Sequence, residues 1–242
     1  MLHVEIAASK VPKYAVRESG DSVEIVERPH GGLSVVMADG QRSGRSAKAI
    51  SNIAVRKSIS LLSEGVRDGA VARATHDYLR AQRNGQVTAE LTIVSVDLET
   101  RTLVISRNSR CPVVLGDGGS WRMLDEPSES AGARARLRPV IVELPLEAGQ
   151  TVIGFSDGVL HAGARVGRPL DLPALLADPA CCSNAPAQEI ADRLLNTALV
   201  LDDGRPADDI TVVVVRVTPS SDNGDGPEVR RMLVSFPVPD VL

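Results

Sequence analysis

The stretch GGLSVVMADGQRSGRSAKAIS, residues 31–51, decides the class of fold expected for this chain. A β-branched, apolar run, LSVVMA, stops at Asp39-Gly40, and a segment with apolar residues at helical spacing follows within a few residues. The run predicts a strand, Asp-Gly predicts a turn, and the recurrence of apolar residues three and four apart predicts a helix. The stretch therefore places a carboxylate where a strand gives way to a turn.

The strand pattern recurs on both sides of this stretch. Strands are expected over residues 3–7, 22–26, 33–37, 88–96, 102–106, 113–115, 140–144, 151–154 and 210–217. Short turn signals such as DLETRT at 97–102 separate many of these segments, which favours antiparallel pairing. Helical spacing predicts helices over residues 46–64, 71–82, 172–177 and 186–199.

This order of elements predicts an α+β fold. The simplest way to bury the apolar faces is two antiparallel β-sheets packed as a sandwich, with helices on both outer faces, an αββα arrangement. We expect one domain over residues 1–218, a polar linker (PSSDNGDGP) at 219–227 and a C-terminal extension at 228–242. The extension is expected to add one edge strand, because Pro237 and Pro239 cut it short.

The composition excludes several classes of partner. Hydrophobic residues make up 43% of the 242 residues, which is enough for a core. A net charge of -4 and only 2% aromatic residues argue against nucleic acid. No apolar run approaches the roughly 18 residues of a membrane helix, and the start of the chain lacks the pattern of a signal peptide. The three cysteines fit neither a disulfide framework nor a zinc site, so a cytoplasmic protein is expected.

Four aspartates share one feature, which is that each lies where a strand meets a turn: Asp21, Asp39, Asp157 and Asp208. Any one of them is most simply a turn residue. Together they can converge at one end of a sandwich, where carboxylates repel one another unless cations lie among them. Mg²⁺ and Mn²⁺ prefer such oxygen ligands, so the pattern indicates a metal site.

The segments that carry these aspartates also form a recognisable series. They are SGDSVEIVERPHGGLSVVMADGQRSGRSAKAIS at 19–51, PLEAGQTVIGFSDGVLHA at 145–162 and RPADDITVVVVRV at 205–217. In this order they resemble the motifs of the PPM (protein phosphatase 2C-like) metal-dependent serine/threonine phosphatases, in particular the bacterial sporulation and sigma-factor-regulating branch. The resemblance covers about residues 15–217.

The resemblance implies a site for two divalent cations, Mn²⁺ or Mg²⁺. Asp39 would bridge both metals, and the carbonyl of Gly40 would help to bind one of them. Asp157 and Asp208 would complete the other site, with Asp39 and Asp157 carrying the catalytic role. Asp21 would bind a metal directly or through water.

More distant roles are implied for four other residues. Asp209 would lie behind the ligands or bind weakly, and a guanidinium near the metals would bind phosphate. The candidates for that guanidinium are Arg17, Arg42 and Arg45, although each of them is more simply interpreted as a solvated surface arginine. The chain departs from the family at 41–43, where Gln-Arg-Ser replaces a glycine-containing stretch, and Gln41 leaves the general acid unassigned.

The function implied is hydrolysis of phosphoserine or phosphothreonine on a protein, by a water activated between two metals. The substrate suggested by the branch is a small anti-anti-sigma-type phosphoprotein. A second reading is a catalytically weak module of the same fold that binds a phosphoprotein partner as a regulator. A third, a metal-dependent esterase or nuclease, is disfavoured by the acidic charge balance.

Overall fold

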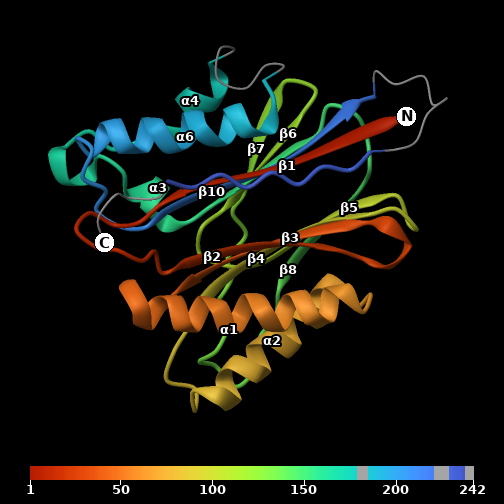
Figure 1. Cartoon of the computed structure of the whole chain (residues 1–242), viewed down its shortest axis with the longest axis horizontal. Helices are drawn as coiled ribbons and strands as arrows, with labels where there is room; N and C mark the ends of the chain where they lie inside the picture. The colour runs from red at the N-terminus through yellow and green to blue at the C-terminus, as the bar shows by residue number, and fades with distance from the viewer. Residues whose placement is uncertain (179–184, 221–228, 238–242) are drawn as a thin grey trace.

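The computed structural model describes residues 1–178, 185–220 and 229–237. Two antiparallel five-stranded sheets lie face to face, with helices outside both (Figure 1). The first sheet contains, in spatial order, β1 (Leu2–Val11), β10 (Ile210–Pro219), β9 (Thr151–Phe155), β6 (Val113–Asp117) and β7 (Ser120–Leu124). The second contains β2 (Asp21–Glu27), β3 (Leu33–Gly40), β4 (Ala89–Asp97), β5 (Thr102–Asn108) and β8 (Val140–Pro145). The predicted αββα sandwich is confirmed.

The helices cover opposite faces of the sandwich. α1 (Gly44–Ser63) and α2 (Asp68–Gln82) pack on the second sheet, and α6 (Ala187–Leu201) packs on β1 and β10 (Figure 1). The shorter elements are η1 (Pro29–Gly31), α3 (Asp157–His161), η2 (Ala164–Val166) and α4 (Leu172–Ala177). No helix in these described parts of the chain is long and apolar enough to cross a membrane.

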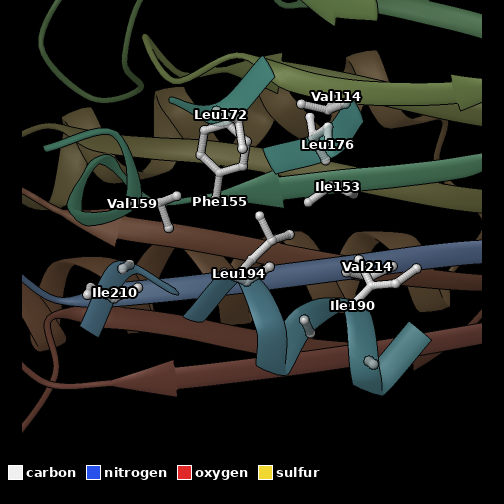
Figure 2. Close-up of a cluster of buried hydrophobic side chains, with 14 of the residues drawn as sticks. Val114, Ile153, Phe155, Val159, Leu172, Leu176, Ile190, Leu194, Ile210 and Val214 are labelled. Carbon is white, nitrogen blue, oxygen red and sulfur yellow. The ribbon is translucent and has the colours of Figure 1, made fainter. Parts of the chain in front are cut away.

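The valine run of β10 shows how the sequence produces a sandwich. Val214 lies in the cluster beneath α6, with Ile190 and Leu194 of that helix (Figure 2), and Val212 belongs to the same cluster. Val213 and Val215 point the other way, into the core between the two sheets. Because side chains alternate along a strand, a continuous apolar run is what a strand buried on both faces requires.

The C-terminal extension differs from the expected edge strand. Residues 229–237 form no strand and are exposed, with Leu233 94% and Val234 84% accessible. The side chain of Arg230 lies 3.5 Å from Glu27, at the end of β2. The apolar side chains of this segment are not buried, so the segment gains no hydrophobic stabilisation from packing on the sandwich. Residues 221–228, most of the expected linker, and 238–242 lie outside the described residues.

Candidate functional site

The second sheet places three carboxylates in a row. Asp21 is the first residue of β2, and it lies directly opposite Asp39 near the end of β3. On the other side of β3, Glu90 of β4 lies directly opposite Asp39. Residues opposite each other in antiparallel strands project to the same face of the sheet. The three side chains therefore share one face at one end of this sheet.

The first sheet contributes two more aspartates from neighbouring strands. Asp157 begins α3 just after β9, and Asp208 lies two residues before β10. The junction between these strands is fixed by Ser156, whose hydroxyl accepts the Thr211 N–H at 2.9 Å and whose N–H donates to the Thr211 carbonyl at 3.0 Å. The two sheets thus present aspartates from both sides of one end of the sandwich.

A pocket of about 600 Å³ opens between these elements. Its acidic lining residues are Asp39, Glu90, Glu129, Asp157 and Asp208, and the backbone of Gly40 belongs to the same wall. Three of the four predicted aspartates, together with Gly40, are therefore brought into one cavity.

Asp21, the fourth aspartate, lies behind this lining. It is fully buried and accepts a hydrogen bond from the Thr211 hydroxyl at 2.5 Å. Its second carboxylate oxygen, Oδ1, has no hydrogen-bond partner among the described residues. Asp21 is thus placed next to Asp39 without itself lining the pocket.

The two Asp-Gly pairs have a steric reason beyond turn formation. A Cβ at position 40 would lie 2.0 Å from the carbonyl oxygen of Ala47 on α1. A Cβ at position 158 would lie 2.2 Å from the carbonyl oxygen of Asp209. Only glycine permits these close approaches, which hold the residues after Asp39 and Asp157 against neighbouring backbone.

The carboxyl groups of Asp39, Asp21 and Asp157 are harder to ionise than that of a free aspartate. Burial, with the added negative charge of Asp21, Asp157 and Asp208, raises the pKa of Asp39 to about 9. Burial also raises the pKa of Asp21 to about 6, against the lowering effect of its hydrogen bond from Thr211. The pKa of Asp157 is raised by burial and then by Asp208. The cluster therefore favours a positive charge within it.

The carboxylates are near one another but do not yet form a coordination shell. In the described ranges, no three or more histidine, cysteine, aspartate or glutamate side chains are gathered so that they could hold a metal ion. What the cluster offers is a set of converging oxygen donors with an excess of negative charge.

The remaining predicted residues divide between the pocket and its surroundings. Arg42 lines the pocket, whereas Arg17 and Arg45 are exposed and are not among its lining residues. Asp209 is buried, and its carboxylate accepts the backbone N–H groups of Lys13 and Gly20 at 2.9 and 2.8 Å. It therefore joins the loop that precedes β2 to the start of β10.

Gln41, where the chain departs from the motif, has a structural partner. Its side-chain oxygen accepts the N–H of Thr88 at 3.2 Å, and its own N–H donates to the Thr88 carbonyl at 3.0 Å. These two bonds join the residue after Asp39-Gly40 to the segment that enters β4.

The sequence analysis does not identify five charged residues of the pocket, which are Lys13, Glu90, Arg110, Glu129 and Arg134. Glu90 and Arg110 are the two that contact each other beside Asp39. The carboxylate of Glu90 accepts the backbone N–H of Arg110 at 2.5 Å, the Nε–H of the same arginine at 3.0 Å and the Ser130 hydroxyl at 2.6 Å. The only sequence signal is a charged residue at the start of the otherwise apolar run AELTIV. That signal does not reveal Asp39 as its neighbour.

Comparison with known sequences gives two results. The family described as Stage II sporulation protein E (SpoIIE) matches residues 29–218. Stage II sporulation protein E of Bacillus subtilis is 24% identical over 214 residues, which are 88% of this chain and 26% of that protein. The chain thus spans about a quarter of the curated relative that it matches.

Comparison with solved structures identifies the same fold. The PP2C phosphatase domain of SpoIIE from Bacillus subtilis, solved with a fragment of its regulatory domain, superposes with a TM-score of 0.77 at 21% identity. The match covers 88% of this chain and 63% of that one. The catalytic domain of the serine/threonine phosphatase PstP, solved with two manganese ions, gives a TM-score of 0.68 at 17% identity and covers 90% and 100%. The sandwich is therefore the PP2C fold.

Proposed function

The chain belongs to the Stage II sporulation protein E (SpoIIE) family, and from this premise we propose that it is a metal-dependent protein serine/threonine phosphatase. The observation that carries the proposal is the shared pocket of Asp39, Asp157 and Asp208 at one end of the sandwich. The reaction would be hydrolysis of a phosphoserine or phosphothreonine ester, which releases the protein hydroxyl and inorganic phosphate.

The residues present fit divalent cations. No hydrogen bond or ion pair reaches the half-buried Asp39 carboxylate from the described residues, and the buried Oδ1 of Asp21 is also without a hydrogen-bond partner among them. Carboxylate and carbonyl oxygens are the donors that Mn²⁺ and Mg²⁺ prefer. We assign Asp39, the Gly40 carbonyl, Asp157 and Asp208 as ligands, with Asp21 acting directly or through water. Asp209, which is already bonded to two backbone N–H groups, would hold the surrounding loops in place.

When bound, two such cations would neutralise the phosphoryl oxygens and lower the pKa of a water molecule. The chain itself would supply position and charge. Asp39 and Asp157 would orient the reacting centre from the two sheets, and the glycines that follow them fix their backbone. Lys13, Arg42 and Arg134 on the pocket wall would attract an anionic substrate.

The leaving hydroxyl also needs a proton. The amide of Gln41 does not ionise, and its oxygen already accepts the Thr88 N–H. We infer that the leaving oxygen takes its proton from water in the open pocket. The substrate we propose is a phosphorylated protein of the anti-anti-sigma type, in keeping with the branch that the motifs resemble.

The decisive experiment offers the chain a phosphoserine peptide, a phosphotyrosine peptide and a phosphodiester in Mn²⁺. Turnover of the phosphoserine peptide well above that of the other two supports the assignment. Preferential cleavage of the diester would replace it with a nuclease or phosphodiesterase.

The altered stretch at 41–43 favours one alternative, a regulator of the same fold with weak or no catalysis. One of its side chains already has a structural role, since the Gln41 side-chain oxygen accepts a hydrogen bond from the Thr88 N–H. Stable binding of a phosphoprotein without turnover on any of the three substrates would support this alternative.

A further inference from the structure

Glu90 receives three hydrogen bonds on one carboxylate beside the proposed metal ligands. Two come from the backbone N–H and the Nε–H of Arg110, and the third comes from Ser130. The side chain of Glu90 is 15% exposed, and it shares its sheet face with Asp39. The carboxylate of Glu90 therefore already has hydrogen-bond donors from the protein, whereas the carboxylate of Asp39 has none among the described residues.

Arg110 extends from this anchor into the pocket. Its side chain is 79% exposed and lines the same cavity as Asp39, Asp157 and Asp208. Only its Nε–H is used by Glu90, and the terminal Nη groups have no hydrogen-bond partner within the described residues. A guanidinium bound through Nε keeps a planar edge of donors available for a second anion.

The loop that carries Arg110 is held rigidly from below. Arg107 is buried, and its guanidinium donates to the carbonyls of Ser109 and Cys111 at 2.6 and 3.3 Å, on either side of Arg110. The same guanidinium donates to the carbonyl of Glu126. The Cys111 N–H donates to the Ser109 hydroxyl at 3.0 Å. The backbone of Arg110 therefore has little freedom to move away from the pocket.

The other arginines of the pocket lack this arrangement. Arg134 forms an ion pair with Glu129 at 3.0 Å, and both side chains are largely exposed. Arg42 lines the pocket, and its backbone is in the left-handed region with a φ of 79°. No hydrogen bond or ion pair fixes its guanidinium in the described structure. Pre-positioning matters because an arginine loses less entropy on binding when its side chain is already held.

We propose that Arg110 binds the phosphoryl group of the substrate and that Glu90 is the positioning residue that holds it there. The inference rests on the proposed function, because the phosphoryl group must enter the pocket of Asp39, Asp157 and Asp208. It assigns the phosphate contact to the loop between β5 and β6 in place of the arginines expected from the sequence. Inorganic phosphate, the product, would use the same contact.

The test compares Arg110→Ala, Arg110→Lys and Glu90→Gln with the unchanged chain. The measured quantities are KM and kcat for a phosphoserine peptide, the inhibition constant of inorganic phosphate, and the Mn²⁺ concentration for half-maximal activity. Arg122→Ala, an exposed arginine on β7 outside the pocket, is the matched control.

Arg110→Ala is expected to raise KM and the phosphate inhibition constant by about tenfold to a hundredfold, because the hydrogen bonds from the guanidinium to the charged phosphoryl group are lost. Its Mn²⁺ requirement is expected to stay the same. Arg110→Lys and Glu90→Gln are expected to give smaller shifts in the same direction. An unchanged phosphate constant in Arg110→Ala overturns the proposal. Glu90→Gln with an altered Mn²⁺ requirement and normal phosphate inhibition would also overturn it, making Glu90 a metal ligand.

A chain without turnover would refute the proposed function but still test this inference. Calorimetric titration of inorganic phosphate in the presence of Mn²⁺ then replaces kinetics. Binding to the unchanged chain that weakens in Arg110→Ala supports the contact. Equal binding to both proteins, or binding to neither, overturns it.

Discussion

Asp39 and Asp21 lie directly opposite each other across the β2–β3 pair, yet only Asp39 lines the pocket. Asp21 is fully buried and holds the hydroxyl of Thr211 on β10. Like charges placed opposite each other destabilise a sheet. Such a pair is therefore kept at a cost in stability, which a cation bound between the two sheets would offset.

Metal binding should be visible as stability as well as activity. Treatment with EDTA should abolish turnover of a phosphoserine peptide, and Mn²⁺ or Mg²⁺ should restore it. Because a ligand that binds only the folded state stabilises it, Mn²⁺ at a hundred times its Kd should add about 2.7 kcal/mol to the free energy of unfolding. Calorimetric melting with and without Mn²⁺ checks this, with Asp157→Asn as the variant expected to lose most of the gain. Full activity in metal-free buffer would contradict the metal assignment.

Asp39→Asn keeps the side-chain shape but removes the proposed bridging charge. Turnover should fall by orders of magnitude, since Asp39 interacts with the carboxylates of Asp157 and Asp208 as well as with Asp21 on its own sheet. The metal-free protein should become more stable near pH 7, because the pKa of Asp39 is raised to about 9 and folding forces this carboxyl to take up a proton, which asparagine does not need. Steady-state kinetics and metal-free melting measure the two effects. Asp21→Asn is the comparison, expected to lose less activity because it lies behind the lining; the reverse order would exchange their roles.

The sequence predicts the parts of the site that depend on local pattern. Asp39 and Asp157 are predicted as site residues because each follows an apolar run and precedes glycine. The strand β10 is predicted because its valines are continuous. The strand β7 is not predicted, since SWRML is short, contains no β-branched residue and is only partly buried. Local pattern thus reveals where strands end.

What local pattern cannot supply is register and long-range pairing. Glu90 became part of the site because β4 pairs with β3 so that residue 90 faces residue 39. Neither residue carries any sign of that register. Arg28 and Asp68 are another example, since a buried ion pair joins residues 40 apart through the packing of α2 on the sheet. Such pairs are decided by tertiary structure and not by the neighbouring sequence.

The Arg28–Asp68 pair should contribute strongly to folding. Their 3.1 Å contact is almost completely buried, and the hydroxyls of Ser34 and Ser95 complete the network. Arg28→Met would leave a buried carboxylate without its cation, which costs about 3–5 kcal/mol. The double variant with Asp68→Asn should recover much of that loss.

Urea unfolding measures both variants of this pair. The matched control is Arg230→Ala, which removes the exposed pair with Glu27 and should change stability by less than about 1 kcal/mol. A loss of similar size for Arg28→Met and Arg230→Ala would show that the buried pair has no special role.

His76 should make stability sensitive to pH. It is buried on α2, its Nδ1 accepts the Gly132 N–H at 2.9 Å, and Nε2 has no hydrogen-bond partner among the described residues. Burial lowers the pKa of His76 from 6.5, against the raising effects of Asp77 and the Arg134 backbone, while Arg80 lowers it further. The folded state therefore keeps the imidazole neutral where the unfolded state would charge it.

The direction of the pH effect follows from linkage. Above pH 6.5 both states are neutral at His76 and its contribution is fully present. As the pH falls from 6.5 toward the lower folded-state pKa, the unfolded chain binds the extra proton and stability is lost, by at most about 1.4 kcal/mol per pH unit. His76→Gln removes this proton but can still accept the Gly132 N–H, so its stability should fall less between pH 7.5 and 5.5.

Urea unfolding at several pH values compares the two proteins, and their difference isolates His76 because the other titrating groups are common to both. His76→Gln should be less stable than the unchanged chain at pH 7.5 by about 1–3 kcal/mol, since the glutamine side chain does not reproduce the packing and hydrogen bonding of the buried imidazole. The difference in stability between the two proteins should become smaller toward pH 5.5, because only the unchanged chain loses stability when the unfolded state binds a proton at residue 76. His3→Gln, at an exposed position on β1, should follow the unchanged chain throughout. Parallel curves for the unchanged chain and His76→Gln would mean that His76 titrates alike in the folded and unfolded states.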